Sequence, residues 1–119
     1  MTSSGGSQAA PLTNRIPVTL KLVGDDGLSQ KLGFEIVAGL RSDDRLRLAI
    51  PTDPRSIVIQ TDSNVDWDIL DGRKVAIVTA YVFSEHEKPF PIVRACWISD
   101  MKKCAREIIR VARKRAPTR

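Results

Sequence analysis

The C-terminal segment of the chain carries the residues best suited to binding chemistry. Residues 100–119 contain eight Lys and Arg side chains against two acidic ones, a net charge of +6. The rest of the chain has a net charge of −1, so the overall charge of +5 comes from this segment. Ammonium and guanidinium groups gathered in this way can neutralise several phosphates and release their counterions. The segment therefore predicts contact with a polyanion.

The same segment has the periodicity of an amphipathic helix. The apolar residues between Met101 and Ala112 fall within roughly 160° of arc at 100° per residue, and most of the cations fall opposite them. Asp100 suits the positive end of a helix dipole, and Pro117 cannot continue a helix. We therefore expect a helix over about 100–115, with an apolar face toward a core and a basic face outward.

The basic face of this helix is the predicted binding surface. A solvated helix face usually mixes charges of both signs to gain pairs four residues apart, and here only Glu107 is available. The repulsion between like charges, such as Arg106 and Arg110, would be relieved by an anionic partner. We predict contacts to a nucleic-acid backbone by Lys102, Lys103, Arg106, Arg110, Arg113, Lys114, Arg45 and Arg47. The simpler interpretation is a solvated face whose cations complement the helix dipole.

Exposed aromatic rings, which single-stranded nucleic acid would use for stacking, are few in this sequence. Phe34, Tyr81 and Phe83 lie within the predicted strands and are interpreted as core residues. Trp67 and Trp97 are the two rings that could be exposed, although Trp is buried on average. A nucleic acid would therefore be contacted through its phosphates and not through its bases.

Nothing in the sequence predicts catalysis or a metal centre. His86 is the only histidine, and its neighbours Glu85 and Glu87 point away from it on an extended chain. A Ser or Cys nucleophile would have no base other than His86, and the glycines form no phosphate-binding loop. The acidic residues over 62–71 have the character of turn formers and solvated charge. We therefore expect no enzyme activity, no cofactor and no metal.

The composition is typical of one globular domain. The chain has 119 residues, of which 42% are apolar and 28% charged. Residues 1–14 are rich in Ser, Gly and Ala without the pattern of a secretory signal, so we expect a flexible arm before a single domain over 15–119. No apolar stretch is long enough to span a membrane, and we expect a cytoplasmic protein. In that compartment Cys96 and Cys104 would be free thiols.

Alternating apolar residues predict strands between about 16 and 98. The six segments are 18–23, 31–38, 45–50, 56–61, 74–83 and 92–98. The Gly and Asp residues at 24–27 predict a hairpin turn. After an acidic connector that contains Asp62, Asp66, Asp68 and Asp71, residues 71–73 predict a turn into the next strand. The segment 74–83 is apolar on both faces, which predicts a central strand that is covered on both sides.

These segments together predict an α+β fold. About six mostly antiparallel strands would form a curved or barrel-like sheet, followed by one C-terminal amphipathic helix, and the pattern shows no β–α–β crossover. The predicted function is that of a small non-enzymatic nucleic-acid-binding protein, acting as a homodimer, with DNA and RNA both open. The alternative is a protein-interaction or self-assembling module, such as an adaptor, a phage accessory protein or a coat-like subunit. Its basic helix would dock on an acidic protein surface, and neither function needs a membrane.

Overall fold

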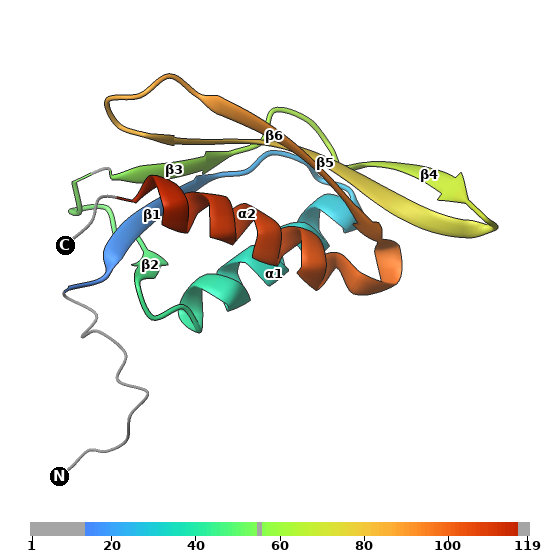
Figure 1. Cartoon of the computed structure of the whole chain (residues 1–119), viewed down its shortest axis with the longest axis horizontal. Coiled ribbons are helices and arrows are strands. Elements are labelled where there is room, and N and C mark those ends of the chain that lie inside the picture. The colour runs from blue at the N-terminus through green and yellow to red at the C-terminus, as the bar shows by residue number, and fades with distance from the viewer. Residues whose placement is uncertain (1–13, 55, 117–119) are drawn as a thin grey trace, which may run out of the picture.

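The computed structural model describes residues 14–54 and 56–116, and these have a mixed α+β fold (Figure 1). The predicted arm over 1–14 lies outside the described residues except for its last position. One curled, six-stranded sheet forms a half-barrel, and two helices lie side by side on one of its faces. The elements in chain order are β1 (Ile16–Lys21), α1 (Gly27–Arg41), β2 (Leu46–Leu48), β3 (Ile57–Gln60), β4 (Asp66–Leu70), β5 (Arg73–Ser84), β6 (Phe90–Trp97), the short 3₁₀ helix η2 (Ile98–Asp100) and α2 (Met101–Arg115).

The long strand β5 is the centre of the sheet. Residues 75–82 of β5 pair with β6 along one edge. Along its other edge, residues 81–84 pair with β3 and residues 73–77 pair with β4, and all three pairings are antiparallel. The strand β1 lies beyond β3 and pairs in parallel with both β3 and β2. The prediction of a mostly antiparallel, curved sheet with a C-terminal helix is confirmed. The sheet is mixed, however, because β1 pairs in parallel with β2 and β3.

The N-terminal helix α1 replaces a predicted hairpin and strand. We expected a turn at 24–27 followed by a strand over 31–38, and this prediction was wrong. Asp26 is the helix cap, because its carboxylate accepts a hydrogen bond from the Ser29 N–H, at 2.9 Å. The buried residues Leu32, Ile36 and Leu40 are four residues apart, so they lie on one face of the helix.

The side chain of Phe34 contradicts its predicted place in the core. Leu32, Phe34 and Ile36 also fit an alternating pattern, which is why the sequence suggested a strand with all three inward. On a helix Phe34 is about 200° away from the buried Leu32, and its side chain is 77% exposed. In this segment the apolar residues spaced four apart determine a helix, although residues 32–36 also fit the alternation of a strand.

The segment from β1 through α1 to β2 is a parallel crossover, which the sequence pattern did not reveal. Ile16 pairs with Leu46 and Val18 with Leu48, while α1 packs over β2. Once residues 27–41 form a helix, two strands on either side of it can align in parallel. The expectation of no β–α–β unit failed because it depended on the wrong assignment of α1.

The hairpin formed by β4 and β5 arises in a segment that we expected to be an acidic connector. The two-residue turn at Asp71 and Gly72 was predicted, and both residues have positive φ angles, 53° and 75°. This geometry is the one that favours Asp-Gly turns between antiparallel strands. All five residues of β4 are exposed, and the hairpin projects beyond the helical layer (Figure 1).

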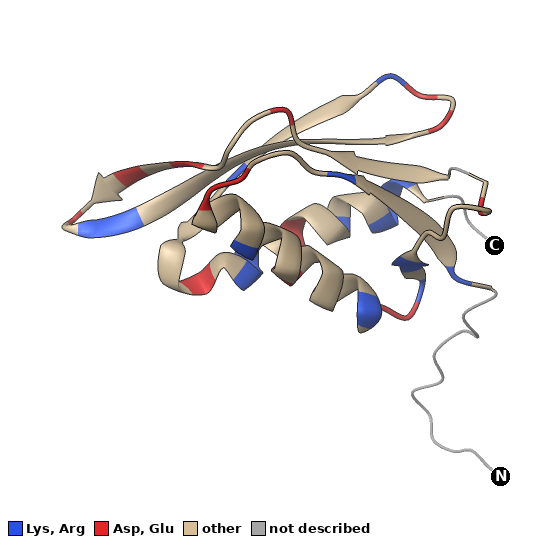
Figure 2. Ribbon diagram, turned by 180° about the vertical axis from the view of Figure 1, so that it is seen from behind, with Lys and Arg blue, Asp and Glu red and all other residues tan. Residues whose placement is uncertain are grey.

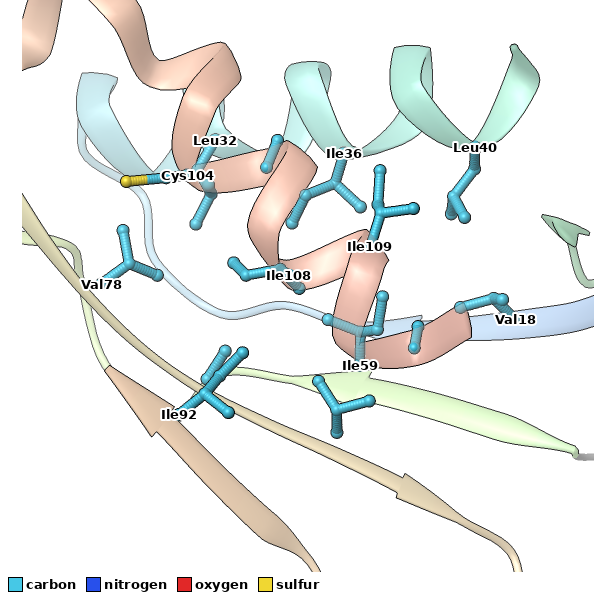
Figure 3. Packing of buried hydrophobic residues seen from close by; sticks show 14 of the residues in the cluster. Val18, Leu32, Ile36, Leu40, Ile59, Val78, Ile92, Cys104, Ile108 and Ile109 are labelled. Carbon is cyan, nitrogen blue, oxygen red and sulfur yellow. The ribbon is translucent and has the colours of Figure 1, made fainter. Parts of the chain in front are cut away.

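The hydrophobic core lies between the helices and one face of the sheet (Figure 3). Ile108 and Ile109 of α2 lie between Leu32, Ile36 and Leu40 of α1 and the sheet residues Val18, Ile59, Val78 and Ile92. Even-numbered residues of β5 from Ala76 to Val82 are buried in this layer. Tyr81 and Phe83 point to the opposite face and are half-buried, and Val58 of β3, which pairs with Phe83, is fully buried. The expectation that β5 is central was right, but the described residues cover its second face only in part.

A disulfide joins the last strand to the last helix. Cys96 of β6 and Cys104 of α2 are bonded, with their Cα atoms 5.8 Å apart, and the prediction of free thiols was wrong. The chain turns sharply through η2 between β6 and α2, which brings the first turn of the helix back against the strand. Both cysteines are buried, as expected for their apolar surroundings.

Candidate anion-binding surface on helix α2

Five cations form an exposed surface on the outer side of α2. The helix buries Met101, Cys104, Ala105, Ile108, Ile109 and Ala112 against α1 and the sheet. The period of 3.6 residues then places its charged positions outward. The exposed residues are Lys102, Lys103, Arg106, Arg110 and Lys114, which we call the α2 cation face. Figure 2 shows blue Lys and Arg segments along the helical layer.

The α2 cation face has no ion-pair partners within the part of the chain that the structure describes. The described ion pairs involve Arg47, Arg94, Arg113 and Arg115, and none of the five exposed cations. Glu107, the one acidic residue of α2, pairs instead with Arg94 of β6, with Nε and Oε1 3.1 Å apart. The five positive charges therefore remain available to an external anion.

Arg113 and Arg115 are held by carboxylates of the same chain. The Arg113 guanidinium lies 3.7 Å from Asp43 and 3.2 Å from Asp44, just beyond the end of α1. Arg115 lies 2.9 Å from Glu87 in the turn between β5 and β6. A hydrogen bond from Ser84 and the nearby guanidinium of Arg115 lower the pKa of Glu87. Arg113 was predicted to contact phosphate, and in the structure it ties α2 to α1.

Arg45 and Arg47 differ in their surroundings. Arg45 is exposed, and its backbone N–H donates to Asp43 Oδ1, so it lies near the C-terminal part of α2. Arg47 binds Asp53 with two hydrogen bonds, of 2.6 and 2.8 Å. The hydrogen bond from Arg47, together with one from the Ile50 N–H, lowers the pKa of Asp53 to about 2. Of these two predicted site residues, Arg45 is the one placed beside the α2 cation face.

A groove between the two helices borders the α2 cation face. It has a volume of about 240 Å³. The lining residues are Glu35, Ala38, Gly39 and Ser42 from α1, and Lys102, Ala105, Arg106 and Ile109 from α2. Gly39 allows the close approach of the helices, because a methyl group at that position would overlap Ile109 Cδ1. The groove thus combines apolar residues with two cations and the carboxylate of Glu35. Sequence reasoning missed the groove because it depends on α1.

An acidic and apolar surface lies on the projecting β4–β5 hairpin and the loop before it. Asp62, Asp66, Asp68 and Asp71 are exposed, and none of them belongs to an ion pair among the described residues. Exposed apolar residues accompany them: Trp67 is 52% exposed, Ile69 59% and Leu70 54%. Arg73 and Lys74 lie over the rings of Trp97 and Trp67. The signal that could have revealed this hairpin was the alternation of Asp66 and Asp68 with Trp67 and Ile69 before the Asp-Gly turn.

The described residues contain no arrangement typical of a metal centre. No group of three or more His, Cys, Asp and Glu side chains among them could hold a metal ion. His86 lies in the exposed turn between β5 and β6. We also find that none of the helices described here is both long and apolar enough to span a membrane.

Comparison with known proteins identifies a fold class and no family. No family model matches the chain, and no curated protein matches it. A hypothetical protein from Chlamydia trachomatis is similar in structure, with a TM-score of 0.58 and 14% identity, over 85% of this chain and 98% of the other. A minor lipoprotein from Acinetobacter baumannii has a TM-score of 0.52 and 14% identity, over 89% and 98%. A PelC dodecamer from Paraburkholderia phytofirmans gives 0.49 and 19%, over 98% and 95%. At these identities the likeness extends to the fold alone.

Proposed function

We propose that the protein is a non-enzymatic interaction module whose α2 cation face docks on an acidic surface of a protein. The observation that carries this proposal is that the five exposed cations have no ion-pair partner among the described residues, while Arg113 and Arg115 of the same helix have carboxylate partners. An adjacent groove with apolar lining residues favours a protein partner, because protein interfaces join apolar contacts to a charged rim. A phosphate backbone alone would make no use of those apolar residues.

The disulfide supports a location other than the cytoplasm that we first expected. Disulfides persist in oxidising compartments and are rare where thiols are kept reduced. The Cys96–Cys104 bond is buried between β6 and α2, and so belongs to the packed core of the fold. We therefore propose that the protein acts in an oxidising compartment.

Nucleic-acid binding is the second candidate, and the same five cations favour it. If all five contacted phosphates of duplex DNA, the logarithm of the binding constant would fall with the logarithm of salt concentration with a slope of about −4.5. Because Arg113 is ion-paired with Asp43 and Asp44, fewer arginines can make bidentate contacts to phosphates. The protein would then bind weakly and without regard to sequence.

Charge reversal on α2 tests the proposed function. The variant Arg106→Glu/Arg110→Glu is compared with Lys21→Glu/Lys74→Glu, which changes net charge equally at exposed positions on β1 and β5, outside α2. Poly-L-glutamate and a duplex DNA of equal charge are the probes, titrated over a range of salt concentrations. We expect the wild type and the control to bind poly-L-glutamate and the α2 variant to lose at least tenfold in affinity. Equal binding by the two variants would refute a role for α2, whereas much tighter binding to DNA with the predicted salt slope would favour the second candidate.

A further inference from the structure

We propose that the acidic partner is a second copy of this chain, whose β4–β5 hairpin enters the groove between α1 and α2. This inference rests on the proposed function, since it names the partner of the α2 cation face. The assembly it describes is directional, with the hairpin of each copy bound by the next. It therefore replaces the closed homodimer that the sequence suggested.

The groove has the shape and lining of a receptor for apolar side chains. Its volume of about 240 Å³ is below the roughly 300–1,000 Å³ of small-molecule sites, and suits the insertion of side chains. Ala38, Gly39, Ala105 and Ile109 line it with apolar groups. Phe34, one turn before Ala38 on α1, adds an exposed aromatic ring on the same side of the helix.

The hairpin supplies groups that complement this lining. Ile69 and Leu70 are exposed next to the tight turn, and Trp67 is exposed two residues before Ile69 on the same strand. Large exposed apolar residues are rare on β strands that face only water, and Trp is among the residues that dominate binding energies at interfaces. The rigid Asp71-Gly72 turn presents these side chains with little loss of conformational freedom on binding.

Charge complementarity selects this occupant. Residues 62–74 carry four Asp against two cations, a net charge of −2, and those two cations lie over Trp rings. Lys102 and Arg106 stand at the groove, where Asp68 and Asp71 of an inserted hairpin would meet them. The unpaired acidic surface and the unpaired basic surface of the chain are thereby satisfied by one contact.

The hairpin does not reach the groove of its own molecule. It projects past the end of the helices, away from the groove between them (Figure 1). Hairpin and groove are different surfaces of one molecule, so each bound copy still has one free hairpin and one free groove. Such contacts build rings when their rotation closes and filaments when it does not.

Two variants that each block one surface provide the test. Ile69→Thr/Leu70→Thr removes the apolar groups of the hairpin at exposed strand positions, where Thr is well tolerated. Ala38→Glu places a bulky negative charge in the groove at an exposed helical position. Val93→Thr is the matched control, because it makes the same kind of change at an exposed position of β6.

Sedimentation velocity measures assembly at low salt, up to about 500 µM so that a contact with a dissociation constant near 1 mM is still detected. We expect the wild type and Val93→Thr to form oligomers with rising concentration, and each blocked variant to remain monomeric. A mixture of the two blocked variants should form a 1:1 heterodimer, because one intact hairpin then meets one intact groove.

The possible failures are distinguishable. A wild type that stays monomeric, yet binds poly-L-glutamate through α2, would overturn the self-assembly and leave the proposed function in place. Oligomers that survive in both blocked variants would show that another surface mediates assembly. Equal poly-L-glutamate binding by the α2 charge-reversal variant and its control would refute the proposed function itself.

Discussion

Cys96 at the end of β6 and Cys104 in the first turns of α2 are joined by a disulfide that closes a loop of only eight residues in sequence separation. In the chain-entropy account, a loop of this length stabilises the folded state by about 2.5 kcal/mol. We expect reduction to lower the free energy of unfolding by that amount, as measured by urea denaturation with and without a reductant. The Cys96→Ala/Cys104→Ala variant should show no effect of reductant, and equal midpoints for reduced and oxidised wild type would contradict the expectation.

The bidentate pair of Arg47 and Asp53 predicts a pH dependence at acidic pH. Because Arg47 and the Ile50 N–H lower the pKa of Asp53 to about 2, the folded state binds a proton there less readily than the unfolded state, whose pKa is near 3.9. The stabilisation by this carboxylate is therefore complete above the unfolded pKa and disappears as pH falls toward the folded pKa.

An Asp53→Asn variant isolates this contribution. We expect it to be less stable than the wild type at neutral pH, with the difference shrinking between about pH 4 and pH 2. The pKa of Asp53 can be followed directly by carboxyl carbon NMR. A titration near the ordinary aspartate value would sink this prediction.

Asp43 and Asp44 are adjacent acids with different structural roles. Asp43 is buried, and its Oδ1 accepts hydrogen bonds from the N–H groups of Arg45 and Leu46, at 2.8 and 2.9 Å. Asp44 is exposed, and among the residues that the structure describes its one ion-pair partner is Arg113. We expect Asp43→Ala to cost about 1–3 kcal/mol, because two backbone donors lose their partner. Asp44→Ala should cost no more than about 1 kcal/mol, as is usual for a surface ion pair. Equal thermal shifts for the two variants would disprove this division of roles.

The turn at Gly72 offers a test of backbone conformation without steric complication. Gly72 has a φ of 75°, and no atom lies within 4 Å of the place a Cβ would occupy. Gly72→Ala should therefore cost about 1–2 kcal/mol, the price of placing an L-residue in the left-handed region. Gly27, which also has open space, begins α1 with an ordinary φ, so Gly27→Ala should be neutral or slightly stabilising. Thermal unfolding of the two variants measures the contrast.

The sequence pattern predicted the elements for which it fits one kind of secondary structure and no other. The helix expected over 100–115 forms over Met101–Arg115, and the Asp-Gly turn before β5 forms as expected. The helix α1 was missed because Leu32, Phe34 and Ile36 fit a strand as well as a helix, and only the packing of Leu40 and Ile36 beside α2 decides between them. The strand β4 was missed because its exposed acidic residues resemble a loop.

The cations of the candidate site were visible in the sequence, whereas their partners were not. The spacing of Lys102, Arg106 and Arg110 places them on one helix face without any tertiary information. That Arg113 meets Asp43 depends on where the end of α1 lies, and therefore on an element that was assigned wrongly. The disulfide likewise depends on the sharp turn through η2, which no period reveals.

The parallel crossover sets an order of events during folding. Ile16 must find Leu46, and Val18 must find Ile57, before β1 can join the sheet, whereas β4, β5, β6 and α2 follow one another through short connections. Contacts between sequence neighbours form first because their loop-closure cost is small. We expect the C-terminal half to nucleate and the N-terminal strand to arrive last, so that φ-values are high in β5 and β6 and low in β1. During synthesis the first strand would then wait, unpaired, for most of the chain to emerge.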